Sequence, residues 1–384
     1  MIIPSASTLA SDNMPKTCWS RIRRFHNVAF VKTLLCKLHD VPRGQEKNVQ
    51  KQAEQLRYCL IQAKEYYDAA QSVSLATKPV LMYYSIMSLA LAEILLKHDG
   101  RSSLDKAPGE NAHHGLRFHI DPPEIAGDQA LHNIAQRFRA TPLIKNKGKR
   151  FGTFELWHIS SRELPILGEL VGISSIGTTT KRHALIMNAT DRSLPKLPAS
   201  GVTLLDCLRY MPSTYSFLGY NNIIPYIVRA KIQLTVNDSA HQNTYNIVIH
   251  PDNASVLETF YEQIKIHPSN MYDINITELP SGLILGFTST KDNVIRFTFP
   301  SSSTWTIDEV RFLAREYSLN EFGLFYVALY IAGNYARYYP DRWLADVDRA
   351  VPIALAIEEL ITQSEQRIPL LALSELSRNY FVAE

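Results

Sequence analysis

The chain of 384 residues is longer than one compact core usually needs, so two or three structural units are expected, or one large domain with an insertion. Its 46% hydrophobic and 20% charged residues are typical of a globular protein and exclude a disordered chain. The formal net charge of +3 is too small to indicate nucleic-acid binding by itself.

The first third of the chain predicts a helical hairpin over residues 55–97. Residues 55–72 place apolar side chains at steps of three and four, which line up as one stripe along a helix. A second helix is expected over residues 80–96, and Pro79 suits its first turn because a missing N–H loses no bond there. The link between the two helices is short, so they are expected to pack antiparallel.

Beyond the hairpin, a polar loop leads to His113 and His114, and residues 128–140 predict another short helix. The middle of the chain changes to alternating apolar and polar residues, which is the period of half-buried strands. Turn residues between these runs favour an antiparallel meander. Strands are expected over residues 227–236, 245–250, 274–279, 283–288 and 294–299.

The last third returns to helices, expected over residues 320–338, 351–362 and 368–380. The fold class is therefore α+β, with mainly helical N- and C-terminal parts packed together and a central antiparallel β-meander insertion. The expected parts are a mainly helical part over residues 1–220, a β part over residues 221–303, and a helical part over residues 304–384 that packs back on the first.

The four cysteines form no CxxC pair, are too sparse for a disulfide scaffold and have the wrong spacing for zinc. They are expected to be reduced and mostly buried thiols in a cytoplasmic protein. No apolar run reaches the roughly 20 residues of a membrane span. The richest run, over residues 80–96, contains Glu93 and predicts a buried helix, so no membrane contact is expected.

No complete catalytic motif is present in the sequence. GxxxxGKS/T, HExxH, GxSxG and Cys/His clusters are all missing, and no dinucleotide fingerprint follows a strand. We therefore expect no cofactor and no metal site. These absences favour a non-enzymatic protein.

Several segments resemble the YaaC-like family of bacterial proteins in their order and spacing. They are QAKEYYDAA (62–70), TKPVLMYYS (77–85), HGL (114–116), GTF (152–154), LLDCLRYMP (204–212) and ARYYPDRW (336–343). The resemblance covers most of the chain. It implies a bacterial protein and little definite chemistry, because the family is itself poorly described.

A broader resemblance is to HEPN helical domains, some of which cut RNA. The similar features are a Tyr83–Tyr84 pair in a long helix, a following glycine and a His–Gly pair. The nuclease members use an Arg and a His separated by four to six residues. Here Arg101 and His113 are 12 positions apart, and Arg21 and His26 fit the spacing but lie outside the hairpin. The likeness implies RNA binding and a setting in antiphage defence.

His113 and His114 are the candidate catalytic residues, with Arg101. A histidine beside a loop can act as a general acid or base because its charge changes near neutral pH, and the arginine could stabilise a phosphate. The structural alternative is that a histidine bonds a carbonyl and holds the loop.

Two further segments carry candidate binding residues for nucleic acid or a ligand. Positive charges that could touch phosphates gather in one short run, and an arginine with aromatic neighbours ends the helix over residues 320–338. The alternatives are a solvated loop and packing over the turn at Pro340. The residues are Lys145, Lys147, Lys149, Arg150, Arg337, Tyr338 and Trp343.

Three functions therefore stay open. The first is an interaction or scaffold protein that binds a protein partner or RNA. The second is a metal-independent ribonuclease acting through Arg101 with His113 or His114, across a homo-oligomer interface if the site needs two copies. The third is a nucleotide-sensing domain that uses Arg337 and its aromatic neighbours.

Overall fold

The computed structural model describes residues 5–42, 44–97, 103–106, 113–122, 130–145, 148–161, 166–173, 182–189, 196–237, 242–250, 274–279, 282–290, 296–298, 303–305, 310–313 and 319–383. The helices are α1 (Met14–Ile22), η1 (Arg23–His26), α2 (Val28–His39), α3 (Glu46–Gln71), α4 (Lys78–Lys97), η2 (Leu104–Lys106), α6 (Leu131–Ala135), α7 (Thr153–Ser161), α8 (Leu204–Tyr210), η4 (Pro212–Thr214), α9 (Tyr215–Tyr220), α11 (Glu321–Tyr338), α12 (Pro340–Asp348) and α13 (Pro352–Ser377). The strands are β1 (Ser5–Leu9), β2 (Leu116–Ile120), β3 (Phe138–Pro142), β4 (Ile166–Ile173), β5 (Arg182–Ala189), β6 (Val202–Thr203), β7 (Ile227–Asn237), β8 (Gln242–His250), β9 (Ile274–Leu279), β10 (Gly282–Thr290), β11 (Arg296–Thr298), β12 (Ser303–Trp305), β13 (Val310–Leu313) and β14 (Asn379–Ala383).

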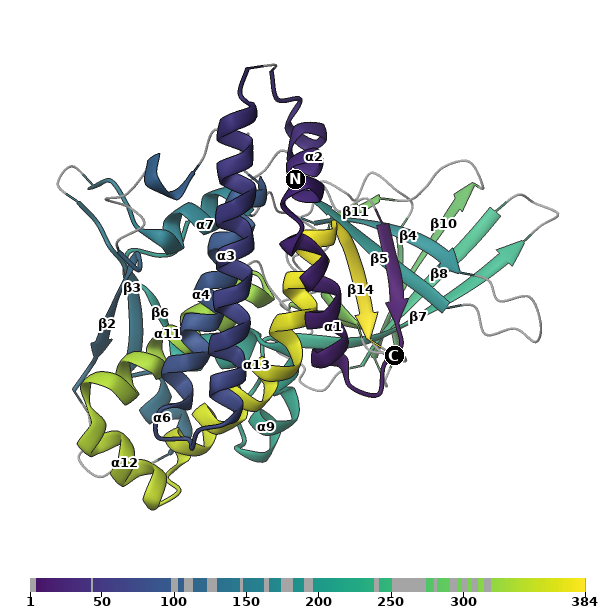
Figure 1. Ribbon diagram of the computed structural model, residues 1–384. Helices are drawn as coiled ribbons and strands as arrows, with labels where there is room; N and C mark the ends of the chain where they lie inside the picture. The colour runs from purple at the N-terminus through teal and green to yellow at the C-terminus, as the bar shows by residue number, and fades with distance from the viewer. Residues whose placement is uncertain are drawn as a thin grey trace.

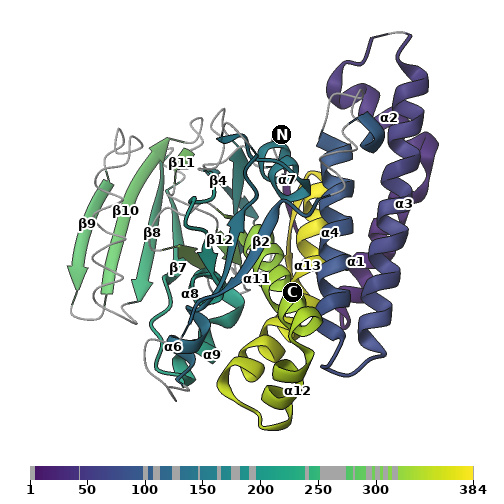
Figure 2. The same ribbon diagram turned by 90° about the vertical axis from the view of Figure 1, so that its left-hand side faces the viewer.

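The α+β class is confirmed, and the N- and C-terminal helices do pack together. Helices α11 and α13 lie against α4, and α1 lies against α13. The six-stranded sheet stands at the opposite end of the molecule from the α3–α4 hairpin (Figure 2). The division of the chain at residues 220 and 303 stays a prediction, and strands β12 and β13 continue the sheet beyond residue 303.

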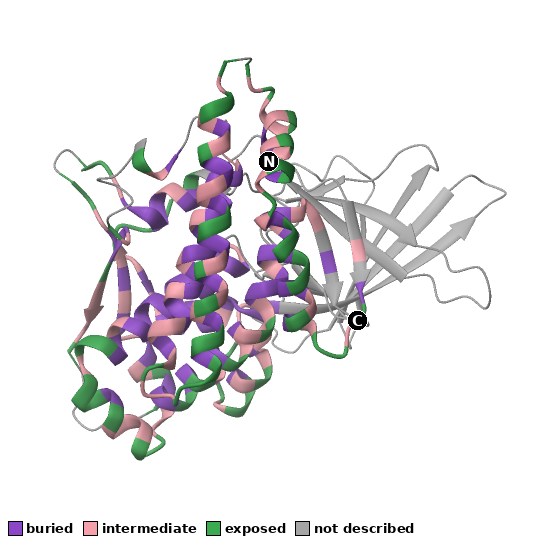
Figure 3. Ribbon diagram, in the orientation of Figure 1, coloured by how far each residue is buried: buried purple, intermediate pink, exposed green. Residues whose placement is uncertain are grey.

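The α3–α4 hairpin forms because each helix buries the face that the spacing predicts. The stripe along α3 is fully covered by its neighbours, and most of α4 is buried (Figure 3). Small residues allow close approach, and Ser85 Oγ donates to Ala63 O across the seam at 2.8 Å. Helix α4 is long and apolar enough to cross a membrane, but 72% of its most apolar 18-residue window is buried against the rest of the protein. It is the central helix of the bundle.

Helix α13 differs from the prediction of two helices over residues 351–362 and 368–380, because it is continuous from Pro352 to Ser377. Proline 369 lacks the N–H that would bond the carbonyl of Glu365. The hydroxyl of Tyr67 donates to that carbonyl at 3.1 Å and satisfies it. The residues between the two predicted helices are bonded to another helix, through the pair of Arg367 with Glu321 on α11. The chain beyond Arg378 is strand, not helix.

The central sheet has the order β12-β13-β7-β8-β10-β9, and every pairing within it is antiparallel. Four of the five predicted strands are found in it as β7, β8, β9 and β10. The fifth, predicted over residues 294–299, is present as β11 but pairs with β4 in a separate sheet of order β11-β4-β5. Strands β4 and β5 fall inside the part expected to be mainly helical.

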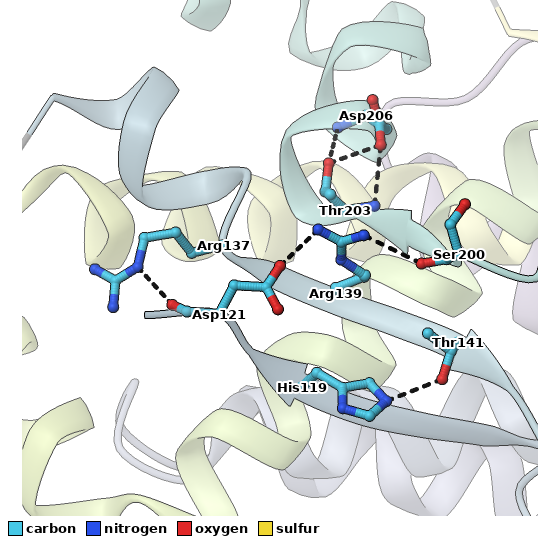
Figure 4. A network of polar contacts seen from close by, with 8 residues as sticks. All are labelled: His119, Asp121, Arg137, Arg139, Thr141, Ser200, Thr203 and Asp206. Atoms are coloured by element: carbon cyan, nitrogen blue, oxygen red, sulfur yellow. Dashed lines mark hydrogen bonds and ion pairs between the residues drawn. The ribbon is translucent and has the colours of Figure 1, made fainter. Parts of the chain in front are cut away.

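A third sheet, β2-β3-β6, corrects the helix predicted over residues 128–140. Only α6 is helical there, and β3 follows it with buried residues at alternate positions. Arg139 on β3 pairs with Asp121 at 2.5 Å and donates to Ser200 O at 3.3 Å (Figure 4). These bonds tie β3 to the chain on both sides, and the capping box of Thr203 and Asp206 starts α8 beside them. This sheet carries the loop of His113 and His114, because β2 begins directly after Gly115.

The two ends of the described chain meet in a parallel pair of strands, β1 with β14. Asn379 Nδ2 donates to Ser7 Oγ at 2.6 Å across a separation of 372 residues. The prediction of reduced, mostly buried cysteines is confirmed, since all four are free and three are buried. Burial raises the pKa of the Cys18 and Cys59 thiols to about 12, which leaves them unreactive.

Candidate functional site

The loop that carries both histidines is held by the start of α7. Thr153 N–H donates to His113 O at 2.8 Å, and Phe154 N–H donates to His114 O at 3.0 Å. Two of the segments with family resemblance, HGL and GTF, therefore meet directly. Gly152 has a φ of +105°, and a Cβ there would lie 2.3 Å from Gly115 Cα, so this contact requires glycine.

The imidazole of His114 is wedged against the helical core. Tyr83 Oη lies 2.9 Å from His114 Nδ1, and the two rings meet edge-on with centroids 5.4 Å apart. Tyr330 on α11 contacts the same ring at 6.1 Å and donates its hydroxyl to Leu116 O. Tyr83 is 4% exposed, so this tyrosine of the Tyr83–Tyr84 pair belongs to the core. The structure thus fixes both the position of His114 and one of its ring nitrogens.

Tyr84 is half-buried, with its ring centroid 6.4 Å from that of His114, and it connects this cluster to the protein surface. Arg337 Nη1 donates to Tyr84 Oη at 2.8 Å, so α11 is joined to α4 there. Tyr66 on α3 stacks on Tyr84 with centroids 5.4 Å apart and an interplanar angle of 30°. The Arg337 guanidinium lies 5.1 Å from the centroid of the Tyr338 ring, and Tyr338 is 61% exposed. We call Tyr66, Tyr84, Arg337 and Tyr338 the tyrosine–arginine surface.

The electrostatic surroundings keep His114 neutral. Burial first, then the positive charges of Arg337 and His113, lower the pKa of His114 below its ordinary value of 6.5. A neutral imidazole can accept or donate a proton at neutral pH, depending on which nitrogen carries hydrogen. Arg337 and His114 are joined through adjacent tyrosines, since Arg337 bonds Tyr84 and His114 bonds Tyr83.

Because the pKa of His114 is lowered in the folded protein, the free energy of unfolding is predicted to depend on pH. The unfolded chain takes up a proton at His114 at a higher pH than the folded chain does, so the free energy of unfolding should fall as the pH drops below 6.5. His26, whose pKa is also lowered mainly by burial, acts in the same direction. Urea unfolding of His114→Gln should lose less stability between pH 7.5 and about pH 5 than the wild type does. Equal losses in the two proteins would contradict this assignment.

The basic segment predicted between Lys145 and Arg150 lies beside His113. The Lys145 ammonium is 4.3 Å from the centroid of the Phe151 ring, and the His113 ring meets Phe151 edge-on at 5.2 Å. Lys145 N–H donates to Lys149 O at 2.8 Å. The exposed Lys145 side chain therefore places a positive charge beside the His113–Phe151 contact.

Residues 23–119 match the family model of YaaC-like proteins. About a quarter of the chain is therefore YaaC-like, from η1 to His119. The predicted resemblance is confirmed over this segment, which contains the hairpin and both histidines. No curated protein and no solved structure matches the chain. The likeness to HEPN helical domains stays a prediction.

The remaining predicted site residues separate into three groups. Arg337 and Tyr338 lie outside the YaaC-like segment, and they reach it through Tyr84. Trp343 does not join them, because it is 1% exposed and its Nε1 donates to Ala76 O at 3.1 Å. The packing alternative holds for Trp343, so it is not part of a binding surface. Arg101 and Lys147 lie outside the described residues.

The site also contains residues that sequence reasoning passed over. Tyr66 was named only within the segment QAKEYYDAA, which resembles the YaaC-like family. The feature that could have identified it as a site residue is the Tyr66–Tyr67 pair, which matches the Tyr83–Tyr84 pair of the next helix. Adjacent helical residues point about 100° apart, so each pair sends one ring inward and one outward. Within the part of the chain that the structure describes, no three His, Cys, Asp or Glu side chains are placed to hold a metal ion.

Proposed function

We propose that this YaaC-like chain is a binding protein for single-stranded nucleic acid, which it holds on the tyrosine–arginine surface. The observation that carries this proposal is the exposed Tyr338 ring beside the Arg337 guanidinium, which is itself anchored on Tyr84. A base can stack on an exposed aromatic ring while a guanidinium contacts the adjacent phosphate.

Further positive groups lie around this surface. Burial raises the pKa of Tyr330, and the negative charge of an ionised Tyr338 would raise it further. The positive charge of Arg117 lowers it, so Arg117 acts on the same ring. Arg117 is exposed on β2, one residue after the His114–Leu116 motif. The exposed Lys145 ammonium and the His113 ring both lie against the Phe151 ring. Cations and aromatic rings are therefore present at the histidine loop as well as at the tyrosine–arginine surface, which supports a site for several nucleotides.

Replacing Arg337 and Tyr338 by alanine is expected to weaken binding of a fluorescein-labelled 12-nucleotide single-stranded RNA at least tenfold, measured by fluorescence anisotropy. Loss of one stacking ring alone is worth about 1–3 kcal/mol per base. Arg337→Ala should also reduce the slope of log affinity against log salt by about 1. Parallel titrations with DNA of the same sequence and with double-stranded RNA show which nucleic acid is preferred.

Matched controls come from an exposed arginine and an exposed tyrosine elsewhere. Arg349 ends α12 and Tyr220 ends α9, where it is 88% exposed. The variant with both Arg349→Ala and Tyr220→Ala makes the same chemical change and should bind as the wild type does. If the two double variants bind alike, or if the wild type binds none of the three nucleic acids, the proposed function is wrong.

A second candidate function is a metal-independent ribonuclease, favoured by the neutral His114 held against Tyr83 and beside Arg337. Cleavage of labelled RNA is then expected in EDTA, and His114→Ala should abolish it while the melting temperature shows a folded protein. His113→Ala, at the exposed neighbouring position, tests which histidine acts. Intact RNA after incubation with the wild type would exclude this activity. A role in antiphage defence rests on the HEPN likeness alone.

A further inference from the structure

A cleft lies beside α3, away from the tyrosine–arginine surface and lined by none of that surface's residues. A cleft of about 540 Å³ opens between α1, η1, α3 and α13, which lie side by side in Figure 1. Two adjacent residues of α3 belong to different sites. Tyr66 stacks on Tyr84 at the tyrosine–arginine surface, and Tyr67 lines the cleft. The volume falls within the range of small-molecule sites.

The floor of the cleft is aromatic and rigid. Trp19 and Tyr67 line it with ring centroids 5.3 Å apart, and both are mostly buried. The Tyr67 hydroxyl donates a hydrogen bond to Glu365 O, which fixes the Tyr67 ring at the junction of α3 and α13. A ligand in the cleft therefore meets a preformed apolar base.

Positive charge dominates the α1 side of the cleft. Lys16, Ser20 and Arg23 follow one another at steps of four and three residues, so they share a face of the α1–η1 segment. Lys16 and Arg23 are separated by two helical turns, roughly 10 Å, which two long side chains can span to reach one anion. His26 extends this wall.

The carboxylates in the cleft are already paired. Asp68 forms an ion pair with Lys64, and Glu365 forms one with Lys78 at 2.7 Å. Among the residues that the structure describes, neither Lys16 nor Arg23 has an ion-pair partner. The pKa of His26 is lowered by burial and then by the charges of Arg57 and Arg23, which agrees with a positive potential there. The unneutralised charge in the cleft is thus positive.

We propose that this cleft binds a small organic phosphate, with the phosphate held by Lys16 and Arg23 and the organic part over Trp19 and Tyr67. Cations on one wall and an apolar floor match a molecule that is anionic at one end and uncharged at the other. Polar side chains at the rim, including Gln71, can bond hydroxyl groups of the ligand. The site differs from the tyrosine–arginine surface in residues and in position.

Isothermal titration calorimetry on the full chain tests this proposal with AMP, ribose 5-phosphate and adenosine. AMP and ribose 5-phosphate should bind at one site per chain and raise the melting temperature, while adenosine, which lacks the phosphate, should not bind. No heat and no thermal shift with either phosphate up to about 10 mM would overturn the proposal. Adenosine binding as tightly as AMP would also overturn it.

The Lys16→Gln/Arg23→Gln variant should lose at least tenfold in affinity for both phosphates. Both side chains are exposed, so its melting temperature without ligand should match that of the wild type. Arg24→Gln is the matched control, because Arg24 lies over Phe30 and does not line the cleft. Arg337→Ala should also keep wild-type affinity, which separates this site from the nucleic-acid surface. Unchanged affinity in Lys16→Gln/Arg23→Gln would refute the assignment.

Discussion

Arg367→Met is expected to lower the free energy of unfolding by about 3 kcal/mol, near the lower end of the range for breaking a buried ion pair. Arg367 on α13 donates to both carboxylate oxygens of Glu321, at 2.9 and 2.7 Å. The Glu321 side chain is 4% exposed, so it would remain buried without its cation. Its place in the first turn of α11 offsets part of the loss, because the helix N-terminus favours negative charge.

Urea unfolding measures this effect, and two controls define it. The variant with Glu321→Gln as well as Arg367→Met should regain a part of the lost stability, because no buried charge remains. Lys51→Met breaks an exposed pair with Asp105 and should change the free energy of unfolding much less than Arg367→Met does, because solvent screens exposed pairs. If Arg367→Met behaves like Lys51→Met, the buried pair does not hold α11 to α13.

Gly152→Ala is expected to destabilise the protein by about 2–5 kcal/mol, from strained backbone and forced displacement of neighbours together. The added Cβ would lie 2.3 Å from Gly115 Cα, 2.5 Å from Gly115 N and 3.0 Å from His113 O. All three atoms are backbone, so no side chain can rotate away. The histidine loop must shift, and His114 should lose its contact with Tyr83. Nucleic-acid affinity should fall along with the melting temperature.

Gly148→Ala is the matched control for Gly152→Ala. Gly148 has a similar left-handed φ of +76°, but nothing lies within 4 Å of an added Cβ. Only the backbone strain of about 1–2 kcal/mol applies there. Thermal unfolding of both variants therefore separates strain from collision. An equal loss of stability in the two would show that the contact between Gly115 and Gly152 does not constrain the loop.

The parts of the fold that sequence predicted are those set by local periodicity. The apolar stripe along α3, the apolar sequence of α4 and the alternation in β7 and β8 are each visible within one short stretch of the sequence. Strands β4 and β5 were missed; they pair with each other as consecutive antiparallel strands, and the pairing of β4 with β11, more than 100 residues further along the chain, is the long-range contact that no single window contains. The predicted break in α13 failed for a related reason: the bonds that keep Glu365 and Arg367 in one helix come from α3, α4 and α11.

The site was predictable as a set of residues but not as an arrangement. His114 and Arg337 were nominated separately, and only the fold shows that the adjacent Tyr83 and Tyr84 connect them. The contact between Gly115 and Gly152 joins positions 37 apart, which no spacing rule would pair. Trp343 was misplaced as a surface candidate because a sequence does not say which side of a turn an indole covers.

The parallel pairing of β1 with β14 has a consequence for how the protein is made. Residues 5–9 cannot form this pair until residues 379–383 have left the ribosome, which at 5–20 residues per second takes roughly 20–70 s after their own synthesis. During that time β1 presents unpaired N–H and C=O groups that could bond to another nascent chain. Residues 379–383 must therefore be synthesised before β1 has its partner, and a chain arrested upstream of Asn379 would keep that edge exposed.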